Sequence, residues 1–431
     1  MRKILVSAYG CEPFRGSEAG VGWNWILQMA RHNEMYVIAR KNDKNKIEDN
    51  IPEEYKNVLH FYYYDTHPVL MKLKKREKGL YLYYWLWQIG IIPLVKKIIK
   101  KEHPDYTMHL TFGSLWMPTF LPFFKVPFIW GPLGGADGVP KAYLKELPFK
   151  QRVVQSMRYI LIKTAPINPL VYFPSKAAVA IIGRTQNNVE AIPQRYRKKC
   201  HVILETAMEN GNLLNERKSI QEKGCVEIIS TGRLVPFKNI RMAIEVLKRI
   251  RDDGYSFHYT IVGKGPEKKQ IEEMVKNYHL AENIKLVGEV PRETVMEYLK
   301  MADMYLFPSL REGGSWALME AMAAELPVVC FDWTGTGVIT DDLCANRIKP
   351  TSMKQDVDCF ADAVEDLINN PEKRVAYGVH ARERILNVYN WDTKGRFMDK
   401  LFDDLEGKSH EKAHCSDAQL RYDAEPGRLR R

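Results

Sequence analysis

The sequence predicts an α/β protein with two parallel β-sheets. Short apolar runs typical of strands alternate with longer stretches of helical periodicity, first over residues 2–203 and again over 225–331. Such alternation is typical of βαβ units. The 431 residues also exceed what a single hydrophobic core usually supports. The expected architecture is therefore two Rossmann-like domains that face a central cleft.

The N-terminal domain is expected over residues 1–210. Its predicted strands span 2–8, 35–40, 59–64, 106–109, 126–130, 179–182 and 201–203, and its main helical stretches span 17–32, 80–101 and 149–164. The strands are rich in β-branched and aromatic residues, and turn residues separate them from the helical stretches.

The C-terminal domain is expected over residues 211–385, after a polar stretch at 212–224 that suits a linker. Its predicted strands span 225–231, 257–262, 284–287, 304–307 and 327–331, with helices at 239–252, 266–279, 292–302 and 316–325. Further helices are expected near 357–369, 373–390 and 391–406. The tail 407–431 is rich in charge and lacks apolar periodicity, which predicts disorder.

The formal net charge of +11 favours acidic partners, which include nucleic acid, anionic lipid and phosphorylated substrates. No nucleic-acid-binding module is recognised, so nucleic acid is not the expected partner. The seven cysteines are scattered without a C-x-x-C pair, which fits a reducing cytoplasm. The apolar run after Lys3 is too short for a secretory signal, and 79–95 is too short and interrupted for a membrane-spanning helix.

Two cations follow the first predicted strand of the C-terminal domain. Arg233 and Lys238 lie between that strand and the next helix, where ligands bind in open α/β sheets. A guanidinium fork and an ammonium group there can hold a diphosphate and stabilise the charge that develops on a departing nucleoside diphosphate. The alternative is that both cations are merely solvated.

A glycine-containing turn follows the strand 257–262. Gly263 and Gly265 permit close approach of a ligand to the backbone. A third glycine of a dinucleotide fingerprint is lacking, so an NAD site is not indicated. An ordinary tight turn before a helix that starts at Pro266 explains the two glycines equally well.

Two glutamates eight positions apart flank the start of helix 316–325. Glu312 falls in the preceding loop and Glu320 in the helix, so the two acids are expected on one side, about two turns apart. Carboxylates at this separation can accept hydrogen bonds from a ribose and a sugar ring. Gly313 and Gly314 leave room at a helix N-terminus, whose dipole favours an anion. Small residues at 332–337, after the next strand, are expected to line the same cleft.

Taken together, these residues resemble family 4 of the retaining glycosyltransferases of the GT-B fold. The resemblance covers about residues 1–405, and its most specific part is the E-x7-E motif of Glu312 and Glu320. It implies that Glu312 contacts the transferred sugar, that Glu320 binds the ribose, and that the helix at 386–406 returns to the N-terminal domain. The donor site is then expected to comprise Arg233, Lys238, Gly263, Gly265, Glu312, Gly313, Gly314, Ser315 and Glu320.

The N-terminal half resembles the acceptor side of this family. The loop with Gly16, Ser17 and Glu18 is similar to the family's glycine-containing loop after the first strand, and Gly134 and Gly135 are expected to line the cleft. His109 resembles the histidine near the reacting carbon, which adds it to Glu312, Arg233 and Lys238 as a predicted catalytic residue. A purely structural role for this histidine is the alternative.

The resemblance also implies the reaction and its requirements. The expected co-substrate is a nucleotide sugar, the acceptor is a glycan or a lipid-linked hydroxyl, and the configuration of the sugar is retained. No metal cofactor is expected. The D-x-D sequence at Asp356 and Asp358 is interpreted as capping of a helix N-terminus.

A basic and aromatic segment at 72–101 suits an anionic membrane surface. Lysines and an arginine precede the aromatic run 81–87, and four more lysines follow it. Peripheral attachment to the inner face of a membrane would fit a lipid-linked acceptor. The alternative is a buried core helix with solvated ends.

Two other functions use the same architecture. One is a sugar-nucleotide-binding protein without turnover, which the retained acids and cations argue against. The other is a sugar-nucleotide epimerase of the GT-B fold, for which no acid and base pairs are identified.

Overall fold

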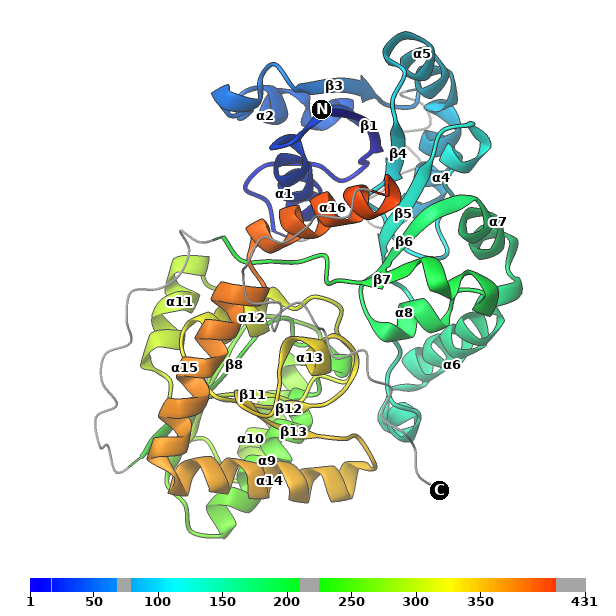
Figure 1. The fold of residues 1–431 in the computed structure, drawn as a ribbon. Coiled ribbons are helices and arrows are strands. Elements are labelled where there is room, and N and C mark those ends of the chain that lie inside the picture. The colour runs from blue at the N-terminus through cyan, green and yellow to red at the C-terminus, as the bar shows by residue number, and fades with distance from the viewer. Residues whose placement is uncertain (17, 68–78, 210–224, 408–431) are drawn as a thin grey trace.

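The computed structural model describes residues 1–16, 18–67, 79–209 and 225–407, and it contains two parallel sheets (Figure 1). The strand order is β3-β2-β1-β4-β5-β6-β7 in the N-terminal sheet and β10-β9-β8-β11-β12-β13 in the C-terminal sheet. In each sheet the order reverses next to the first strand, between β1 and β4 and between β8 and β11. Ligands bind outside the carboxyl ends of the strands at such a reversal. The fold prediction is confirmed.

The strands of the N-terminal sheet agree closely with the expected ones, and so do the helices at 18–30 and 149–164. The expected helix 80–101 is instead two helices, and the helices at 44–48, 169–177 and 186–190 were not predicted. The strands are β1 Arg2–Ser7, β2 Asn33–Arg40, β3 Leu59–Tyr64, β4 Tyr106–His109, β5 Phe128–Leu133, β6 Ala178–Gly183 and β7 Cys200–Val202. The helices are α1 Glu18–Ala30, α2 Lys44–Glu48, α4 Leu80–Gly90, α5 Ile92–Glu102, α6 Phe149–Thr164, α7 Pro169–Ala177 and α8 Gln186–Glu190. β4 and β5 are buried along their whole length, as expected of central parallel strands covered on both faces.

The C-terminal half repeats the pattern. Its strands are β8 Val226–Thr231, β9 Phe257–Val262, β10 Ile284–Gly288, β11 Met304–Phe307, β12 Val328–Phe331 and β13 Ala345–Ile348. Its helices are α9 Ile240–Asp252, α10 Lys268–Asn277, α11 Arg292–Met301, α12 Trp316–Ala323, α13 Thr334–Ile339, α14 Met353–Asn369, α15 Pro371–Val388 and α16 Trp391–Leu405. The apolar side chains spaced along one face of α9 are buried in the core, as their periodicity predicts.

Two elements of this half were absent from the sequence prediction, α13 and β13. β13 lies at the edge of its sheet and carries polar residues that bind neighbouring acids: Asn346 donates to Asp366 at 3.1 Å, and Arg347 pairs with Asp342 at 2.7 Å. α13 has the sequence TGTGVI, whose two glycines are typical of a turn. Both elements form because of tertiary contacts rather than local propensity.

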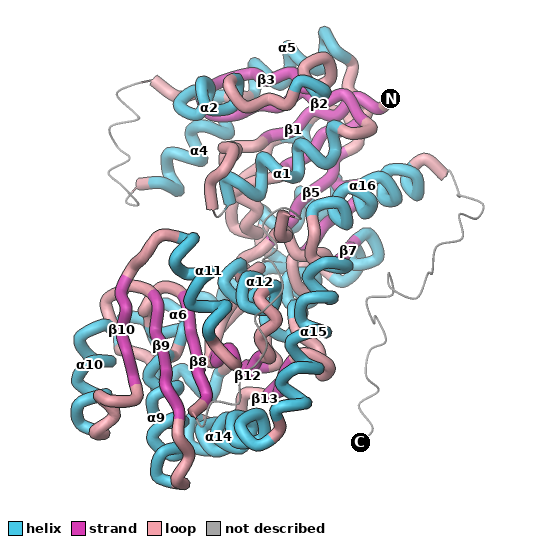
Figure 2. The backbone as a smooth tube through the Cα atoms, turned by 90° about the vertical axis from the view of Figure 1, so that its left-hand side faces the viewer, coloured by secondary structure: helices cyan, strands magenta, loops and turns pink. Residues whose placement is uncertain are grey.

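The last helix, α16, packs against α1 of the N-terminal half, while α15 stays with the C-terminal half (Figures 1 and 2). Trp391, Met398 and Phe402 of α16 belong to the hydrophobic core that includes β1 and β2. Asp392 forms an ion pair with Arg31 at 2.7 Å. The chain therefore crosses between the two halves a second time near residue 390.

The segment that follows β5 packs into the opposite half. Val139, Tyr143 and Leu147 are buried in the C-terminal core, and the Tyr143 hydroxyl donates to Asp356 Oδ2 at 2.6 Å. Ser352 caps α14, so Asp356 is not the N-terminal cap that the sequence predicted. Its carboxylate is buried in the first turn of the helix, where it also accepts hydrogen bonds from the backbone N–H and the hydroxyl of Thr351.

Asp356→Ala is expected to lower the free energy of unfolding by about 2–4 kcal/mol, because the buried Tyr143 hydroxyl loses its carboxylate acceptor and is left with only a weak sulfur acceptor, Met242 Sδ at 3.7 Å. Asp358→Ala is the matched control on the same helix. Asp358 is exposed and pairs with Arg249 at 2.9 Å, so its loss is expected to cost less than about 1 kcal/mol. Urea unfolding measures both, and equal losses would contradict a role for Asp356 in joining the two halves.

Candidate active site

The loop after β8 presents the two predicted cations at the carboxyl end of that strand. Arg233 is exposed, and Lys238 ends a short 3-10 helix, Pro236–Lys238. The loop is fixed by its backbone: the N–H of Gly232 donates to Val262 at 2.9 Å, and that of Leu234 donates to Lys264 at 2.9 Å. The backbone of the loop that carries the two cations is therefore fixed by hydrogen bonds to the neighbouring loop.

Lys238 and Glu312 meet at the carboxyl ends of the neighbouring strands β8 and β11. The Lys238 Nζ atom lies 2.5 Å from Glu312 Oε1, and the Ser309 hydroxyl donates to the same oxygen at 2.5 Å. Lys238 Nζ also lies 5.0 Å from the centroid of the Phe307 ring. Only 15% of the Lys238 side chain and 10% of the Glu312 side chain are exposed. The two residues therefore form one preorganised pair at the strand-order reversal.

Glu320 lies in α12 and binds a different cation. Its Oε1 atom accepts a hydrogen bond from Arg292 Nε at 2.7 Å. Burial raises the pKa of Tyr305, and the charges of Glu320 and Glu312 raise it further, so both acids lie near this β11 residue. Both glutamates therefore lie near the same strand, β11.

Arg311 joins this cluster, although the sequence analysis gave it no role. Burial and the charge of Arg158 lower the pKa of Arg311 to about 10, and Arg233 contributes in the same direction while Glu312 opposes it. The Arg311 guanidinium carbon lies 4.7 Å from the centroid of the Phe237 ring. Its position after a strand and directly before Glu312 is the signal that could have identified it.

The glycines of the next loop serve packing between backbones. A Cβ atom on Gly263 would lie 1.8 Å from the carbonyl oxygen of Gly232, and one on Gly265 would lie 2.2 Å from that of Leu234. Both glycines are therefore required by the neighbouring loop that carries the cations. Their contact with a ligand stays a prediction.

The turn before α12 packs against the segment after β7. A Cβ atom on Gly314 would lie 1.9 Å from Thr206 Oγ1, and one on Gly313 would lie 3.7 Å from Glu205 Oε1. Ser315 caps α12, since its side chain accepts from the backbone N–H of Leu318 at 3.4 Å. This turn is therefore the place where the donor-side loop meets the N-terminal half.

The loop after β1 reaches the same place. A Cβ atom on Gly16 would lie 3.5 Å from the Trp316 ring of α12. Ser17 lies outside the described residues. Burial raises the pKa of Glu18, opposed by the charge of Arg184, whose Nη2 lies 3.9 Å from Glu18 Oε1.

Arg184 follows β6 and connects several predicted acceptor-side groups. A Cβ atom on Gly134 would lie 2.9 Å from Arg184 Nη1, which itself lies 3.2 Å from Glu205 Oε1. The Gly135 carbonyl accepts a hydrogen bond from Arg158 at 3.0 Å. Arg184 was not selected from the sequence, although a cation directly after a predicted strand is the same signal that identified Arg233.

Lys394 of α16 adds a buried amine near the carboxylate of Glu205. Its side chain is fully buried, and burial lowers its pKa to about 7, opposed by the charge of Glu205. No sequence motif marks this lysine, because only the fold brings α16 to the segment after β7.

Lys394→Met is expected to raise the free energy of unfolding at pH 6 by about 1–4 kcal/mol. The pKa of Lys394 is depressed in the folded protein, so the unfolded chain binds more protons between about pH 7 and 10.5, and wild-type stability rises with pH there. The advantage of the methionine variant should therefore shrink as the pH rises. Denaturant unfolding from pH 6 to 9 measures it, and a constant difference would contradict the depressed pKa.

His109 ends β4 in the interior of the N-terminal half. It is buried, and its Nε2 atom lies 3.4 Å from the Tyr84 hydroxyl. Burial lowers its pKa to about 4, so the ring is neutral at pH 7. The structure therefore shows His109 in a core position next to the strand-order reversal. Its catalytic role stays a prediction.

A cavity of about 870 Å³ lies between α6, α8 and the C-terminal half. Tyr159, Lys141 and Arg197 line it from one side, and Trp333 lines it from the other. The Trp333 indole N–H donates to the Gly138 carbonyl at 2.8 Å. Within the described part of the chain, no three His, Cys, Asp or Glu side chains gather as a metal site would require.

Comparison with known proteins finds similarity to glycosyltransferases, mainly in the C-terminal half. Residues 214–384 match the family described as "Glycosyl transferases group 1". The amylovoran biosynthesis glycosyltransferase AmsK of Erwinia amylovora is 39% identical over 116 residues, which are 26% of this chain. The match spans only 28% of that curated relative.

Solved structures resemble nearly the whole chain. WaaG, a glycosyltransferase involved in lipopolysaccharide biosynthesis, has a TM-score of 0.56 at 16% identity, with 92% of this chain and 99% of that chain covered. HepE of Anabaena in complex with UDP and glucose has a TM-score of 0.55 at 12% identity, with 94% and 100% covered. The two parallel-sheet domains thus have the GT-B fold, and the findings support a place for the chain in the GT-B glycosyltransferase superfamily.

Proposed function

We propose that the protein is a retaining glycosyltransferase. It transfers a sugar from a nucleoside-diphosphate sugar to a hydroxyl group of a glycan or lipid-linked acceptor, in the synthesis of a cell-surface polysaccharide. The names of its relatives support this class, since AmsK is named for amylovoran biosynthesis and WaaG for lipopolysaccharide biosynthesis. The UDP and glucose in the HepE structure support a nucleotide-sugar donor.

The observation that carries the proposal is the group of cations around Glu312. Arg233, Lys238 and Arg311 gather where the strand order of the C-terminal sheet reverses. Fixed cations at this position can bind the two phosphates of a donor and stabilise the negative charge that grows as the diphosphate leaves. Because Lys238 is already held by Glu312, little reorganisation is needed when the donor binds.

The two acids take different parts of the donor in this proposal. Glu312, beside Lys238, contacts the transferred sugar, and Glu320, on α12, accepts hydrogen bonds from the ribose. Gly313 and Gly314 keep the turn between them free of side chains. This division agrees with the separate ion pairs that the two glutamates form, one with Lys238 and one with Arg292.

The proposed reaction exchanges one bond to the anomeric carbon for another. The bond from this carbon to the diphosphate oxygen breaks, and the acceptor oxygen forms a new bond on the same face. The hydroxyl proton passes to the leaving diphosphate. The expected sites of the acceptor are the loops with Gly16, Glu18, Gly134 and Gly135. The cations supply the charge stabilisation, so a metal is not expected to be needed.

A panel of nucleotide sugars tests this function through thermal stabilisation and release of nucleoside diphosphate, with and without EDTA. The expected result is one stabilising donor whose diphosphate is released in an acceptor-dependent and EDTA-insensitive reaction. Binding without release would instead support a non-catalytic binding protein. Conversion of the sugar nucleotide to an isomer without release would support an epimerase.

The proposed place of action is the cytoplasm, at the inner face of a membrane that carries the acceptor. In the described residues, no helix combines the length and the apolar character needed to cross a bilayer. Contact of 72–101 with lipid stays a prediction. The residues 72–78 of that segment lie outside the described residues, and Tyr83, Tyr84 and Trp87 of α4 are buried in the core.

A further inference from the structure

The helix α6 buries its polar face and exposes its apolar face, which is the reverse of an ordinary surface helix. Gln155 is its most buried residue, with 7% of its surface exposed, and Arg158 and Tyr159 are also turned inward. The side chains on the opposite face are 42–76% exposed, and they are Phe149, Val153, Val154, Met157, Ile160 and Leu161. Their spacing places them in one stripe along the helix.

Specific hydrogen bonds hold α6 in this orientation. Arg158 donates to the carbonyl of Gly135 at 3.0 Å, and the Tyr159 hydroxyl donates to the carbonyl of Val139. Arg152 donates to the carbonyl of Leu144 at 3.1 Å. Rolling the helix to cover its apolar stripe would break these bonds, so the exposure of the stripe is built into the fold.

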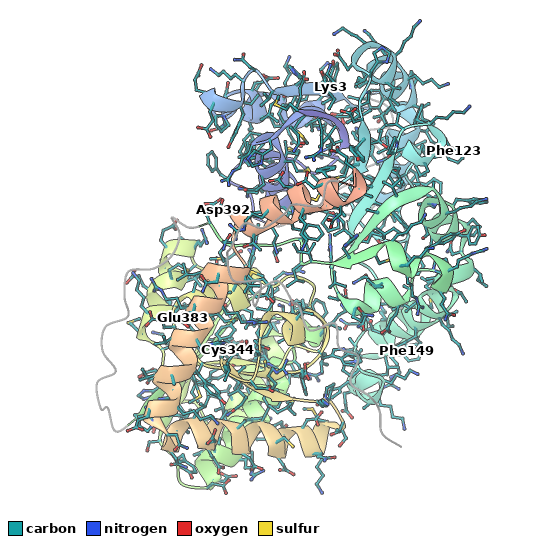
Figure 3. The ribbon with its side chains drawn as sticks, in the orientation of Figure 1. Lys3, Phe123, Phe149, Cys344, Glu383 and Asp392 are labelled. Atoms are coloured by element: carbon teal, nitrogen blue, oxygen red, sulfur yellow. The ribbon has the colours of Figure 1, made fainter. Side chains whose placement is uncertain are left out.

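The apolar surface continues beyond α6. Ile167 is 79% exposed in the turn that follows α6, and Phe173 is 58% exposed in α7. Phe123, which is 75% exposed, is labelled well apart from Phe149 in Figure 3 and is therefore not counted with this surface. Exposed apolar side chains that gather on one face of a helix in this way mark an interaction surface.

The charged side chains of α6 have one sign. The helix contains no aspartate or glutamate, and its exposed cations are Lys150, Arg152 and Lys163, whereas Arg158 is turned inward. Lys150 and Lys163 are exposed at the two ends of the stripe. An apolar stripe flanked by cations complements a surface that offers both negative charge and an apolar interior.

We propose that the exposed face of α6, continued by Ile167 and Phe173, docks on an anionic lipid bilayer. The stripe would enter the boundary between headgroups and acyl chains, while Lys150 and Lys163 would contact the headgroups. A second copy of this chain fits less well, because it would bring two cationic segments of a protein with a net charge of +11 together. The docking surface is separate from the segment 72–101 and from the donor site.

Co-sedimentation with vesicles tests the docking surface. The full-length protein is expected to bind phosphatidylcholine vesicles that contain phosphatidylglycerol at least about tenfold more tightly than pure phosphatidylcholine vesicles. The triple variant Val154→Ser, Met157→Ser and Ile160→Ser is expected to lose at least about tenfold of this affinity. These side chains are exposed, so its thermal unfolding temperature should match that of the wild type.

Matched substitutions distinguish vesicle binding through this surface from nonspecific adsorption through any exposed apolar side chain. Leu343→Ser, Val375→Ser and Val379→Ser remove three apolar side chains that are 45–62% exposed in the C-terminal half, and this variant should bind like the wild type. A second pair of variants compares charges. Lys150→Gln with Lys163→Gln should weaken binding, whereas Lys268→Gln with Lys269→Gln, at exposed lysines of α10 in the C-terminal half, should leave it unchanged. Lys96→Gln with Lys97→Gln on α5 tests the separate prediction for 72–101.

Several results would overturn the proposal. One is a wild type that shows no preference for anionic vesicles, and another is an α6 variant that binds them as tightly as the wild type does. Loss of binding only in the Lys96 and Lys97 variant would assign lipid contact to 72–101 instead. A wild-type dimer in sedimentation velocity that the triple α6 variant abolishes would assign the stripe to a second copy. Transfer of the sugar to a soluble acceptor, with release of nucleoside diphosphate, should be unchanged in all α6 variants, which separates this test from that of the donor site.

Discussion

Lys238→Ala is expected to lower the rate of nucleoside diphosphate release from the cognate donor by about 10²- to 10³-fold. Lys238 lies on a rigid loop at the strand-order reversal, and its Nζ atom is fixed 2.5 Å from Glu312. Removing a preorganised cation leaves the departing diphosphate with less stabilisation in the transition state. The variant should also bind nucleoside diphosphate more weakly, since the product carries the same phosphates.

Lys373→Ala is a closely matched control for this variant. Lys373 pairs with Asp366 at 2.6 Å and lies 4.9 Å from the centroid of the Tyr377 ring, so it shares both kinds of contact with Lys238. It lies on α15, away from the loops after β8 and β11. Its loss should leave the rate unchanged. An equal loss of rate in both variants would show that Lys238 acts through stability rather than through the donor.

Glu312→Gln is expected to lower turnover by about 10²-fold or more while nucleoside diphosphate binding changes by less than about tenfold. The amide keeps the shape of the side chain, but it removes the charge that faces the transferred sugar and holds Lys238. Binding of the diphosphate depends on the positive charges of Arg233, Lys238 and Arg311, and this substitution removes none of them. Steady-state kinetics and calorimetric titration of the product measure the two effects separately.

Asp366→Asn removes the same kind of charge from the matched Lys373 pair. It should change neither turnover nor product affinity. If Glu312→Gln abolished nucleotide binding as well, the acid would belong to the nucleotide pocket rather than to the sugar subsite. Wild-type turnover in Glu312→Gln would refute its assigned role.

Most of the fold follows from patterns that are local in sequence. The predicted strands and helices of both sheets lie within a few residues of the observed ones, because buried parallel strands and amphipathic helices each have a clear period. β13 and α13 were not predicted, since Arg347 and Asn346 are polar at the sheet edge and α13 contains two glycines. The short helices α2, α7 and α8 were not predicted either. Asp356 was wrongly predicted as a helix cap because α14 begins at Met353, before the expected start near 357, and is capped by Ser352.

The candidate site is predictable to the extent that each loop follows its own strand. Position after a strand identified Arg233, Lys238 and Glu312, and the strand order then brings Lys238 and Glu312 together. Contacts between the two halves could not be predicted from the sequence. Lys394 reaches Glu205 only because α16 returns to the N-terminal half.

The same limit applies to the surface of the molecule. The basic and aromatic segment 72–101 could be predicted as a membrane contact because its residues are adjacent in sequence. The stripe on α6 is an ordinary amphipathic pattern until the fold shows which face is buried. Hydrogen bonds from Arg158 and Tyr159 reverse the usual orientation, and periodicity alone does not contain that information.

A crystal structure of the protein with bound nucleoside diphosphate tests the central claim most directly. We expect both phosphates to lie between the loops after β8 and β11, with oxygens within hydrogen-bonding distance of Arg233 and Lys238, and the ribose to lie next to Glu320. A nucleotide bound elsewhere, such as in the cavity lined by Lys141 and Arg197, would contradict the assignment of the donor site.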